Sequence, residues 1–161
     1  MARAVGVDPR IGDKFLRAGI GFGGSCFKKD ILNLVYLAES CGLEEVGEYW
    51  RQVVKMNDYA RDRFSNRVIR CLNNTLVGKK VTILGYAFKK NTSDTREAPA
   101  LEMIRTLLEE RPAEIAVFDP CCNPLVIKDE IEALLGAVVQ SGNVRVYGDG
   151  YEACHLSLIH I

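Results

Sequence analysis

Residues 81–88, VTILGYAF, form the apolar run that decides the fold of this 161-residue chain. The run is rich in β-branched residues and has lysines at its start and end, which is typical of a strand buried in a parallel sheet. We predict a strand from Lys80 to Gly85, with the change in sequence texture beginning at Gly78.

The segments after this run alternate between helix and strand patterns. Leucine and isoleucine recur at helical spacing from Ala98 or Pro99 to Glu110, where a proline suits the first helical position. Shorter patterns predict a strand at 114–118, a helix at 127–135 and a strand at 144–147. This alternation predicts a partial, doubly wound parallel sheet of the Rossmann-like α/β class.

The sequence before Gly78 carries helical patterns in place of strands. One helix is predicted from 26 to 41, with Gly42 suited to its end. A second runs from 44 to 76 and would be about 45 Å long at ~1.5 Å per residue. That length exceeds what one small domain covers, so we interpret this helix as a connector, a subunit contact or both. The predicted layout is a helical central and dimerisation domain at 1–77 and a partial α/β domain at 78–161.

Composition narrows the class of protein. The 21 basic and 21 acidic residues cancel to a formal charge of zero, which removes the long-range field of a nucleic-acid binder. No stretch is long and apolar enough to cross a bilayer, and the N-terminus lacks the apolar core of a signal peptide. We therefore expect a cytoplasmic protein without nucleic-acid or membrane partners.

Six cysteines are scattered along the chain, and their spacing suits neither a disulfide framework nor a metal site. There is no CxxC pair, and both histidines lie in the last seven residues, so no four-ligand zinc cluster is offered. We expect reduced thiols, with Cys41 and Cys71 buried and inert on helix faces. Cys26 stands apart because of its neighbours.

The glycine-rich segment 19–25, GIGFGGS, must be a loop whose backbone N–H groups can approach an anion closely. Ser25 is expected to cap the helix that follows, with Cys26 in its first turn. The helix dipole, together with Lys28 and Lys29, would then favour the thiolate over the thiol. The alternative for Cys26 is a buried, inert cysteine.

Two further interpretations of this region stay open at the level of sequence. Asp30 lies one helical turn after Cys26 and would orient the thiol or a water, or it is a solvated first-turn acid. Gly19, Gly21 and Gly24 also satisfy the GxGxxG spacing of a dinucleotide fingerprint. The preceding KFLRA carries charge where a buried strand should be apolar, which disfavours that fingerprint.

A second constellation, YAFKKNTSDTR at 86–96, directly follows the predicted strand. Ligands of open α/β sheets bind outside the carboxyl ends of the strands. Phe88, Lys89, Lys90 and Arg96 stand there, and an aromatic ring with cations suits a base and a phosphate. A solvated basic loop is the alternative.

Three stretches resemble a known family: GFGGSCFKKDILNLVYL at 21–37, EYWRQVVKMNDYARDRF at 48–64 and VTILGYAFKKNTSDTREAPA at 81–100. They are similar to nucleotide-sugar dehydrogenases of the UDP-glucose/GDP-mannose dehydrogenase family. The first and third stretches favour its UDP-glucose 6-dehydrogenase branch. The similarity runs from about Ala2 to about Cys154.

This resemblance implies a two-step oxidation of UDP-glucose to UDP-glucuronate with two NAD⁺. Cys26 would be the nucleophile that carries a thiohemiacetal and then a thioester, and Asp30 would assist hydrolysis. Arg10 would reach the substrate bound by a neighbouring subunit, and the long helix would form the contact of a homodimer or higher oligomer. The other substrate contacts would be Arg17, Ala18, Gly19, Ile20, Gly21, Phe22, Gly23, Phe88 and Lys89. The NAD contacts would be Cys26, Phe27, Lys28, Lys29 and Arg96.

The chain also departs from the family pattern. The N-terminal NAD-binding domain of the family has no counterpart, so we expect an inactive fragment or a silent dimerisation and UDP-binding module. Asn91 and Ser93 replace the usual aspartate and glycine, and a positive φ at Ser93 would be strained. The tail HLSLIHI at 155–161 matches no part of the pattern, and a sheet truncated there would leave its far edge uncovered.

Overall fold

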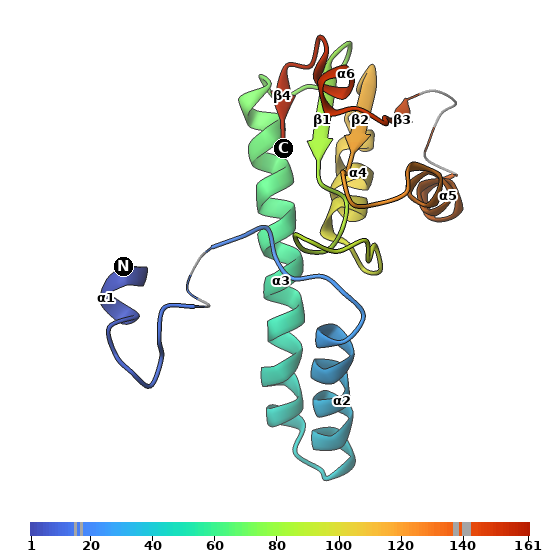
Figure 1. Cartoon of the computed structure of the whole chain (residues 1–161). Coiled ribbons are helices and arrows are strands. Elements are labelled where there is room, and N and C mark those ends of the chain that lie inside the picture. Colours follow the sequence, from blue (N-terminus) through green and yellow to red (C-terminus); the bar gives the residue numbers. More distant parts are fainter. Residues whose placement is uncertain (15, 17, 137–138, 140–142) are drawn as a thin grey trace.

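A four-stranded parallel sheet forms one end of the molecule in the computed structural model, which describes residues 1–161 except 15, 17, 137–138 and 140–142 (Figure 1). Its strand order is β3-β2-β1-β4. The strands are β1 Lys80–Leu84, β2 Glu114–Phe118, β3 Val144–Val146 and β4 Ile159–His160. The α/β class and the first three strands are thus confirmed, with bounds within one residue of those predicted.

Two antiparallel helices, α2 (Phe27–Ser40) and α3 (Glu44–Cys71), lie side by side before the sheet (Figure 1). Gly42, at a φ of 72°, makes the tight turn between them. The long helix ends at Cys71, five residues before the predicted end. The chain turns there because Asn73 and Asn74 both take left-handed backbone angles, which no helix continues.

The hydrophobic core lies between the sheet and its covering helices, α4 (Pro99–Glu109), α5 (Pro124–Leu135) and the last turns of α3. Strand β1 contributes Val81 and Ile83, whose neighbours in β2 are also buried. From the α3 side, Val68, Ile69, Leu72 and Leu76 join the same cluster. The far end of the long helix is therefore packed into the core of the sheet.

The tail of the chain covers the edge of β1. Ile159 and His160 pair in parallel with Val81 and Thr82, and the amide of Leu84 donates to the carbonyl of Ile161 at 2.7 Å. Just before it, α6 (Gly150–Cys154) accepts a hydrogen bond from the Thr82 hydroxyl through the carbonyl of Ala153, at 2.9 Å. The tail thus pairs with β1 through Leu158, Ile159 and Ile161, and the short strand β4 becomes the outer strand on this side of the sheet.

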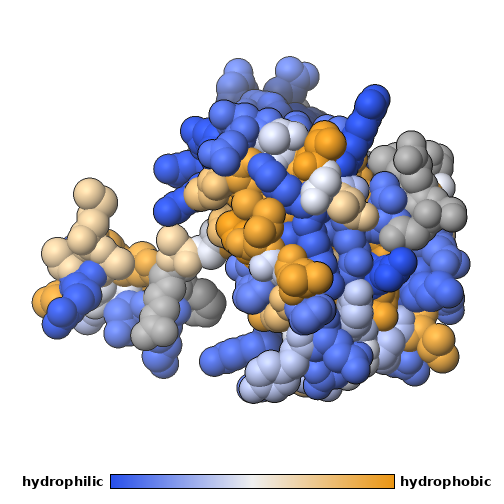
Figure 2. Space-filling view, turned by 90° about the horizontal axis from the view of Figure 1, so that it is seen from above, coloured by the Kyte–Doolittle hydropathy of each residue, from blue (hydrophilic) through white to orange (hydrophobic). Residues whose placement is uncertain are grey.

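The N-terminal segment stands apart from the body of the molecule. It contains the short helix α1 (Ala2–Val5), which buries none of its residues. Figure 2, seen from above Figure 1, shows this segment projecting beside a body whose surface mixes charged and apolar residues. In the described part of the chain, no helix has both the length and the hydropathy of a membrane span.

Candidate functional site

Cys26 lies at the start of α2, and its thiol is exposed. Its own backbone is already helical, with φ −95° and ψ −53°, and its carbonyl accepts from the Asp30 amide at 2.9 Å. Ser25 was predicted to cap this helix and does not: its hydroxyl lies 3.8 Å from the Cys26 sulfur. The helical conformation begins one residue after Ser25, so Cys26 itself occupies the cap position.

The charges around the thiol are partly paired with one another. The Lys28 ammonium group forms an ion pair with Glu97 at 3.0 Å, so the positive charge predicted beside the thiol is shared with a carboxylate. Arg96 pairs with Asp94 at 2.7 Å. The pKa of Arg96 is raised, chiefly because its guanidinium donates hydrogen bonds to the Asp94 carboxylate.

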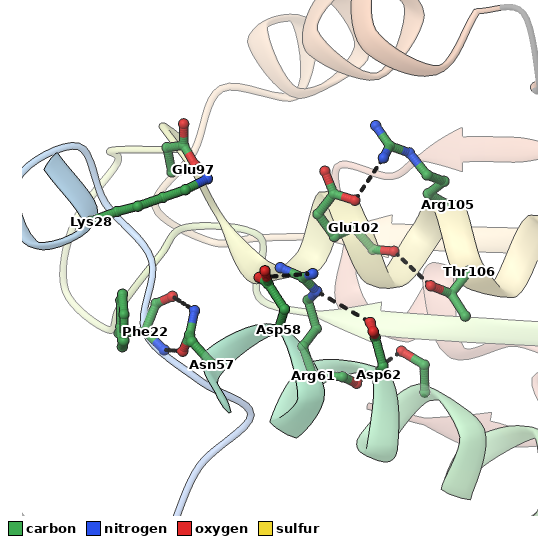
Figure 3. A network of polar contacts seen from close by, with 11 residues as sticks. Phe22, Lys28, Asn57, Asp58, Arg61, Asp62, Glu97, Glu102, Arg105 and Thr106 are labelled. Carbon is green, nitrogen blue, oxygen red and sulfur yellow. Dashed lines mark hydrogen bonds and ion pairs between the residues drawn. The ribbon is translucent and has the colours of Figure 1, made fainter. Parts of the chain in front are cut away.

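Asn57, from the middle of α3, forms hydrogen bonds with both main-chain polar groups of one residue of the glycine loop, Phe22 (Figure 3). The Phe22 amide donates to Asn57 Oδ1 at 2.7 Å, and Asn57 Nδ2 donates to the Phe22 carbonyl at 3.0 Å. Sequence reasoning missed this residue. The available signal was a polar side chain in the apolar stripe of the long helix, four positions after Val53.

Phe88 packs against the glycine loop. A Cβ added to Gly24, which has a φ of 88°, would lie 3.0 Å from the Phe88 ring, and one on Gly23 would lie 2.5 Å from the carbonyl oxygen of Glu97. Both positions therefore require glycine for close packing. The contact brings the segment after β1 against the loop that leads to Cys26.

A cavity of about 840 Å³ opens at the carboxyl ends of β1 and β2. Its volume falls in the range of small-molecule sites. Lys89 and Lys90 line it and Phe88 does not. The remaining lining comes from Leu84, Gly85, Ala87, Asn91, Thr92, Phe118, Asp119, Pro120, Cys121, Asp149, Gly150, Tyr151 and Cys154.

Asp119, in the wall of this cavity, ties the end of β2 to the end of β1. It is 8% exposed and accepts four backbone hydrogen bonds, from the amides of Tyr86, Ala87, Cys121 and Cys122 at 2.7–3.1 Å. Burial alone would raise the pKa of Asp119, but the four donors outweigh it and the pKa is lowered. Sequence reasoning missed Asp119 too, although an Asp-Pro pair directly after a strand marks such a turn.

A smaller cavity of about 420 Å³ lies behind the glycine loop, between α3 and α4. Figure 3 shows its charged side chains in pairs. Arg61 pairs with Asp58 at 3.2 Å, and Arg105 with Glu102 at 3.0 Å. These ion pairs connect residues within each helix, so the charges of this cavity largely neutralise one another.

The other predicted site residues are dispersed. Phe27, Lys29 and Asp30 are all exposed in the first turn of α2. In the loop before it, Ala18 and Gly19 are exposed and Ile20 is half-buried. Arg10 belongs to the projecting N-terminal segment, where its side chain is 87% exposed and pairs with Asp8 at 2.7 Å. Arg17 lies outside the described residues.

Two expectations about single residues are corrected by the structure. Cys41 and Cys71 are exposed, because Cys41 follows the last residue of α2 and Cys71 falls beside the buried stripe of α3. The left-handed backbone predicted at Ser93 occurs at Asn91 instead, with a φ of 60°.

Two sequence profiles of one family match the chain. The central domain of the UDP-glucose/GDP-mannose dehydrogenase family matches residues 1–59, and the UDP binding domain of that family matches residues 82–156. The chain is 54% identical over 158 residues to UDP-glucose 6-dehydrogenase of Drosophila melanogaster, covering 95% of this chain and 33% of that protein. It is 58% identical over 117 residues to UDP-glucose 6-dehydrogenase 4 of Arabidopsis thaliana, covering 73% and 24%.

A solved structure agrees with these matches. A UDP-glucose dehydrogenase from the archaeon Pyrobaculum islandicum superposes with a TM-score of 0.76 and 35% identity, over 97% of this chain and 33% of that one. The chain thus spans about a third or less of the length of the relatives it matches. On these matches and this fold, the chain belongs to the UDP-glucose/GDP-mannose dehydrogenase family, with sequence of its central and UDP-binding domains.

Proposed function

We propose that this chain supplies the UDP-sugar site and the nucleophilic thiol of an NAD-dependent oxidoreductase that converts UDP-glucose to UDP-glucuronate. One observation carries the proposal: an exposed thiol stands at the N-terminus of a 14-residue helix, directly after a glycine loop against which Phe88 packs. The names of the relatives, UDP-glucose 6-dehydrogenases, support the choice of substrate.

The substrate site combines the large cavity with the glycine loop. Lys89, in the cavity wall, supplies positive charge for the diphosphate, and Phe88 is the predicted contact of the UDP part beside it. The main chain from Ala18 to Gly23 offers N–H and carbonyl groups to the sugar, except at Phe22, where both groups are bonded to Asn57. Arg10, on its projecting segment, would complete the site of a second copy.

The residues at the start of α2 fit one side of an NAD molecule. No side chain of the described residues caps this helix end, so its first-turn N–H groups face outward as anion donors. Phe27, Lys28 and Lys29 contribute these groups, and Arg96, which precedes the Glu97 that pairs with Lys28, would add a guanidinium. The chemistry supplied by NAD⁺ when bound is hydride acceptance, once in each of the two oxidations.

Cys26 divides the second oxidation into easier steps. Its thiolate sulfur adds to the C6 aldehyde carbon, and the carbonyl oxygen takes up a proton to give a thiohemiacetal. Loss of a hydride and a proton leaves a thioester. Water then adds to the thioester carbon while Asp30 takes one of its protons. The C–S bond breaks to release the Cys26 thiolate, and the carboxylic acid formed gives its proton to solvent.

A silent dimerisation and UDP-binding module is the second candidate. It is favoured by exposed apolar residues on α2 and α3, which include Leu32, Tyr36, Val46, Tyr49, Met56 and Tyr59. We propose a division into a dimerisation unit at 1–77 and a UDP-binding unit at 78–161, with no turnover by these 161 residues alone. Turnover of NAD⁺ with UDP-glucose by the purified chain would contradict this part of the proposal.

Iodoacetamide labelling tests the thiol. Cys26, Cys41, Cys71 and Cys121 are all exposed, so accessibility alone predicts similar rates. Cys26 should label several-fold faster near neutral pH, as roughly expected for a thiol at a helix N-terminus. Equal rates at all four thiols would overturn the nucleophile assignment. Calorimetry with UDP-glucose, with Lys89→Ala as the variant expected to bind more weakly, tests the substrate site separately.

A further inference from the structure

The Asn57 contact fixes both main-chain polar groups of a single loop residue. Because the amide of Asn57 both donates and accepts, it pairs with Phe22 as a neighbouring strand would. Helix α3, which carries Asn57, is packed into the sheet core through Val68 and Ile69. The glycine loop is thereby tied to a rigid element, although its own backbone is rich in glycine.

The shape of the loop matches this contact closely. Gly21 takes a φ of 116°, and a Cβ there would lie 2.6 Å from Asn57 Oδ1. The main chain therefore passes directly over the amide group, at a distance that only glycine permits. The glycine at position 21 leaves room for the side chain at position 57, and the sequence pattern of the helix does not reveal this dependence.

The contact also reaches the thiol. The Phe22 ring meets the Phe27 ring edge to face, with centroids 4.6 Å apart, and Phe27 directly follows Cys26. Fixing the backbone of Phe22 thus fixes the aromatic pair that borders the start of α2. Asn57 points at the loop (Figure 3) and lines the smaller cavity, and it is not among the residues that line the large one.

We infer that Asn57 is a positioning residue, which holds the glycine loop in its sugar-binding form and Cys26 in its reactive position through Phe22 and Phe27. This inference rests on the proposed function. Asparagine is required because the Phe22 carbonyl needs a donor and the Phe22 amide an acceptor. Aspartate of the same shape would accept only, and its charge would face the carbonyl oxygen.

The test compares Asn57→Ala with Asn66→Ala in the full chain. Asn66 is exposed on the same helix, so both changes raise helix propensity equally, and only the first removes the loop contact. Asn57→Ala should weaken UDP-glucose binding roughly tenfold, as expected for two lost hydrogen bonds, and UDP binding less. The labelling rate of Cys26 relative to Cys41 should fall toward one. Asn57→Asp, which keeps the acceptor, should fall between wild type and Asn57→Ala.

Three outcomes decide the inference. Unchanged affinity and an unchanged Cys26 rate in folded Asn57→Ala would overturn it. An equal change at every thiol would show a merely structural role and would also overturn it. If the wild-type chain binds no UDP-glucose and labels all thiols equally, the proposed function fails by itself. Hydrogen exchange of the Phe22 amide then decides: faster exchange in Asn57→Ala alone supports the contact, and unchanged exchange refutes it.

Discussion

Asn91 adopts a left-handed backbone conformation, with a φ of 60°, in the turn beside Lys89 and Lys90. Asparagine tolerates this region better than other residues with a Cβ, because its short polar side chain bonds locally. The turn that presents the cavity lysines therefore favours asparagine over most other residues that carry a Cβ.

Asn91→Ala should lower the free energy of unfolding by about 1 kcal/mol, because alanine pays more for a left-handed conformation. For a chain of this size, the thermal midpoint should fall by roughly 2–4 °C. Ser93→Ala is the control, since Ser93 is not among the positive-φ residues. A larger loss at Ser93 than at Asn91, measured by circular dichroism, would refute this account.

Both oxygens of the Asp119 carboxylate accept hydrogen bonds from backbone N–H groups. In Asp119→Asn, the side-chain NH₂ group would replace one of these oxygens and would face N–H donors that it cannot accept from. Asp119→Asn should destabilise the fold by about 2 kcal/mol at neutral pH, the scale of hydrogen bonds to a charged group. The pKa of Asp119 is lowered, so its stabilisation is present above the ordinary value of 3.8 and is lost as the pH falls through the folded pKa.

The difference in the free energy of unfolding between wild type and Asp119→Asn should therefore shrink as the pH is lowered. Urea unfolding of wild type and variant, well above and well below that ordinary pKa, measures the difference. Other carboxylates with a lowered pKa, such as Glu48 and Asp94, are common to both proteins and cancel. A deficit that is constant with pH would show that Asp119 acts by shape alone.

Sequence reasoning at the residue scale found groups whose side chains carry chemistry, and missed those that act on the main chain. Cys26 and Lys89 stood out because thiols and cations have recognisable roles. Asn57 and Asp119 act by binding main-chain groups that include ones far away in the sequence: Phe22 lies 35 positions before Asn57, and Tyr86 lies 33 positions before Asp119. Such partners are known only once the fold brings them together.

At the scale of elements, periodicity predicted most helices and strands, and local capping decided their ends. Helix α5 begins at Pro124, three residues before the predicted start, because Asn123 caps it by accepting from the Leu125 amide at 2.9 Å. Apolar spacing could not reveal this turn, since Leu125 and Val126 are exposed. The strand in the tail was missed because two residues are too short to show alternation.

Asn123→Ala should lower the free energy of unfolding by about 1 kcal/mol, the usual effect of losing the side-chain cap at the N-terminus of a helix. Ser25→Ala is the matched comparison at α2, where the serine makes no capping bond, and it should leave the unfolding midpoint unchanged. Chemical denaturation of both variants checks the pair. A comparable loss for Ser25→Ala would mean that Ser25 caps α2 in solution.

At the scale of the whole molecule, the long helix joins two regions that the sequence suggested as separate. Its final turns and Leu76 belong to the core of the sheet, while its first half packs against α2. Sequence patterns located the boundary near residue 77, because that is where helical spacing gives way to a strand. They could not show that the helix is shared, since packing partners across the boundary leave no periodic signal.

Leu76→Ala should therefore destabilise both regions together, by roughly 2–5 kcal/mol for a fully buried leucine. Trp50, the only tryptophan, lies in the first half of α3 and reports on the helical pair. Its fluorescence and the far-ultraviolet dichroism should shift to the same lower midpoint. Two separate transitions would show that the helical pair unfolds independently of the sheet.

The strand formed by the tail also limits how the protein can be handled. Ile161, the final residue, is hydrogen-bonded to β1 and accepts from Leu84, whose side chain lines the large cavity. Affinity handles or fluorescent fusions attached to Ile161 would emerge beside this large cavity and strain the hydrogen bonds that join Ile161 to Thr82 and Leu84. Attachment at Met1, on the projecting segment, leaves that pocket undisturbed.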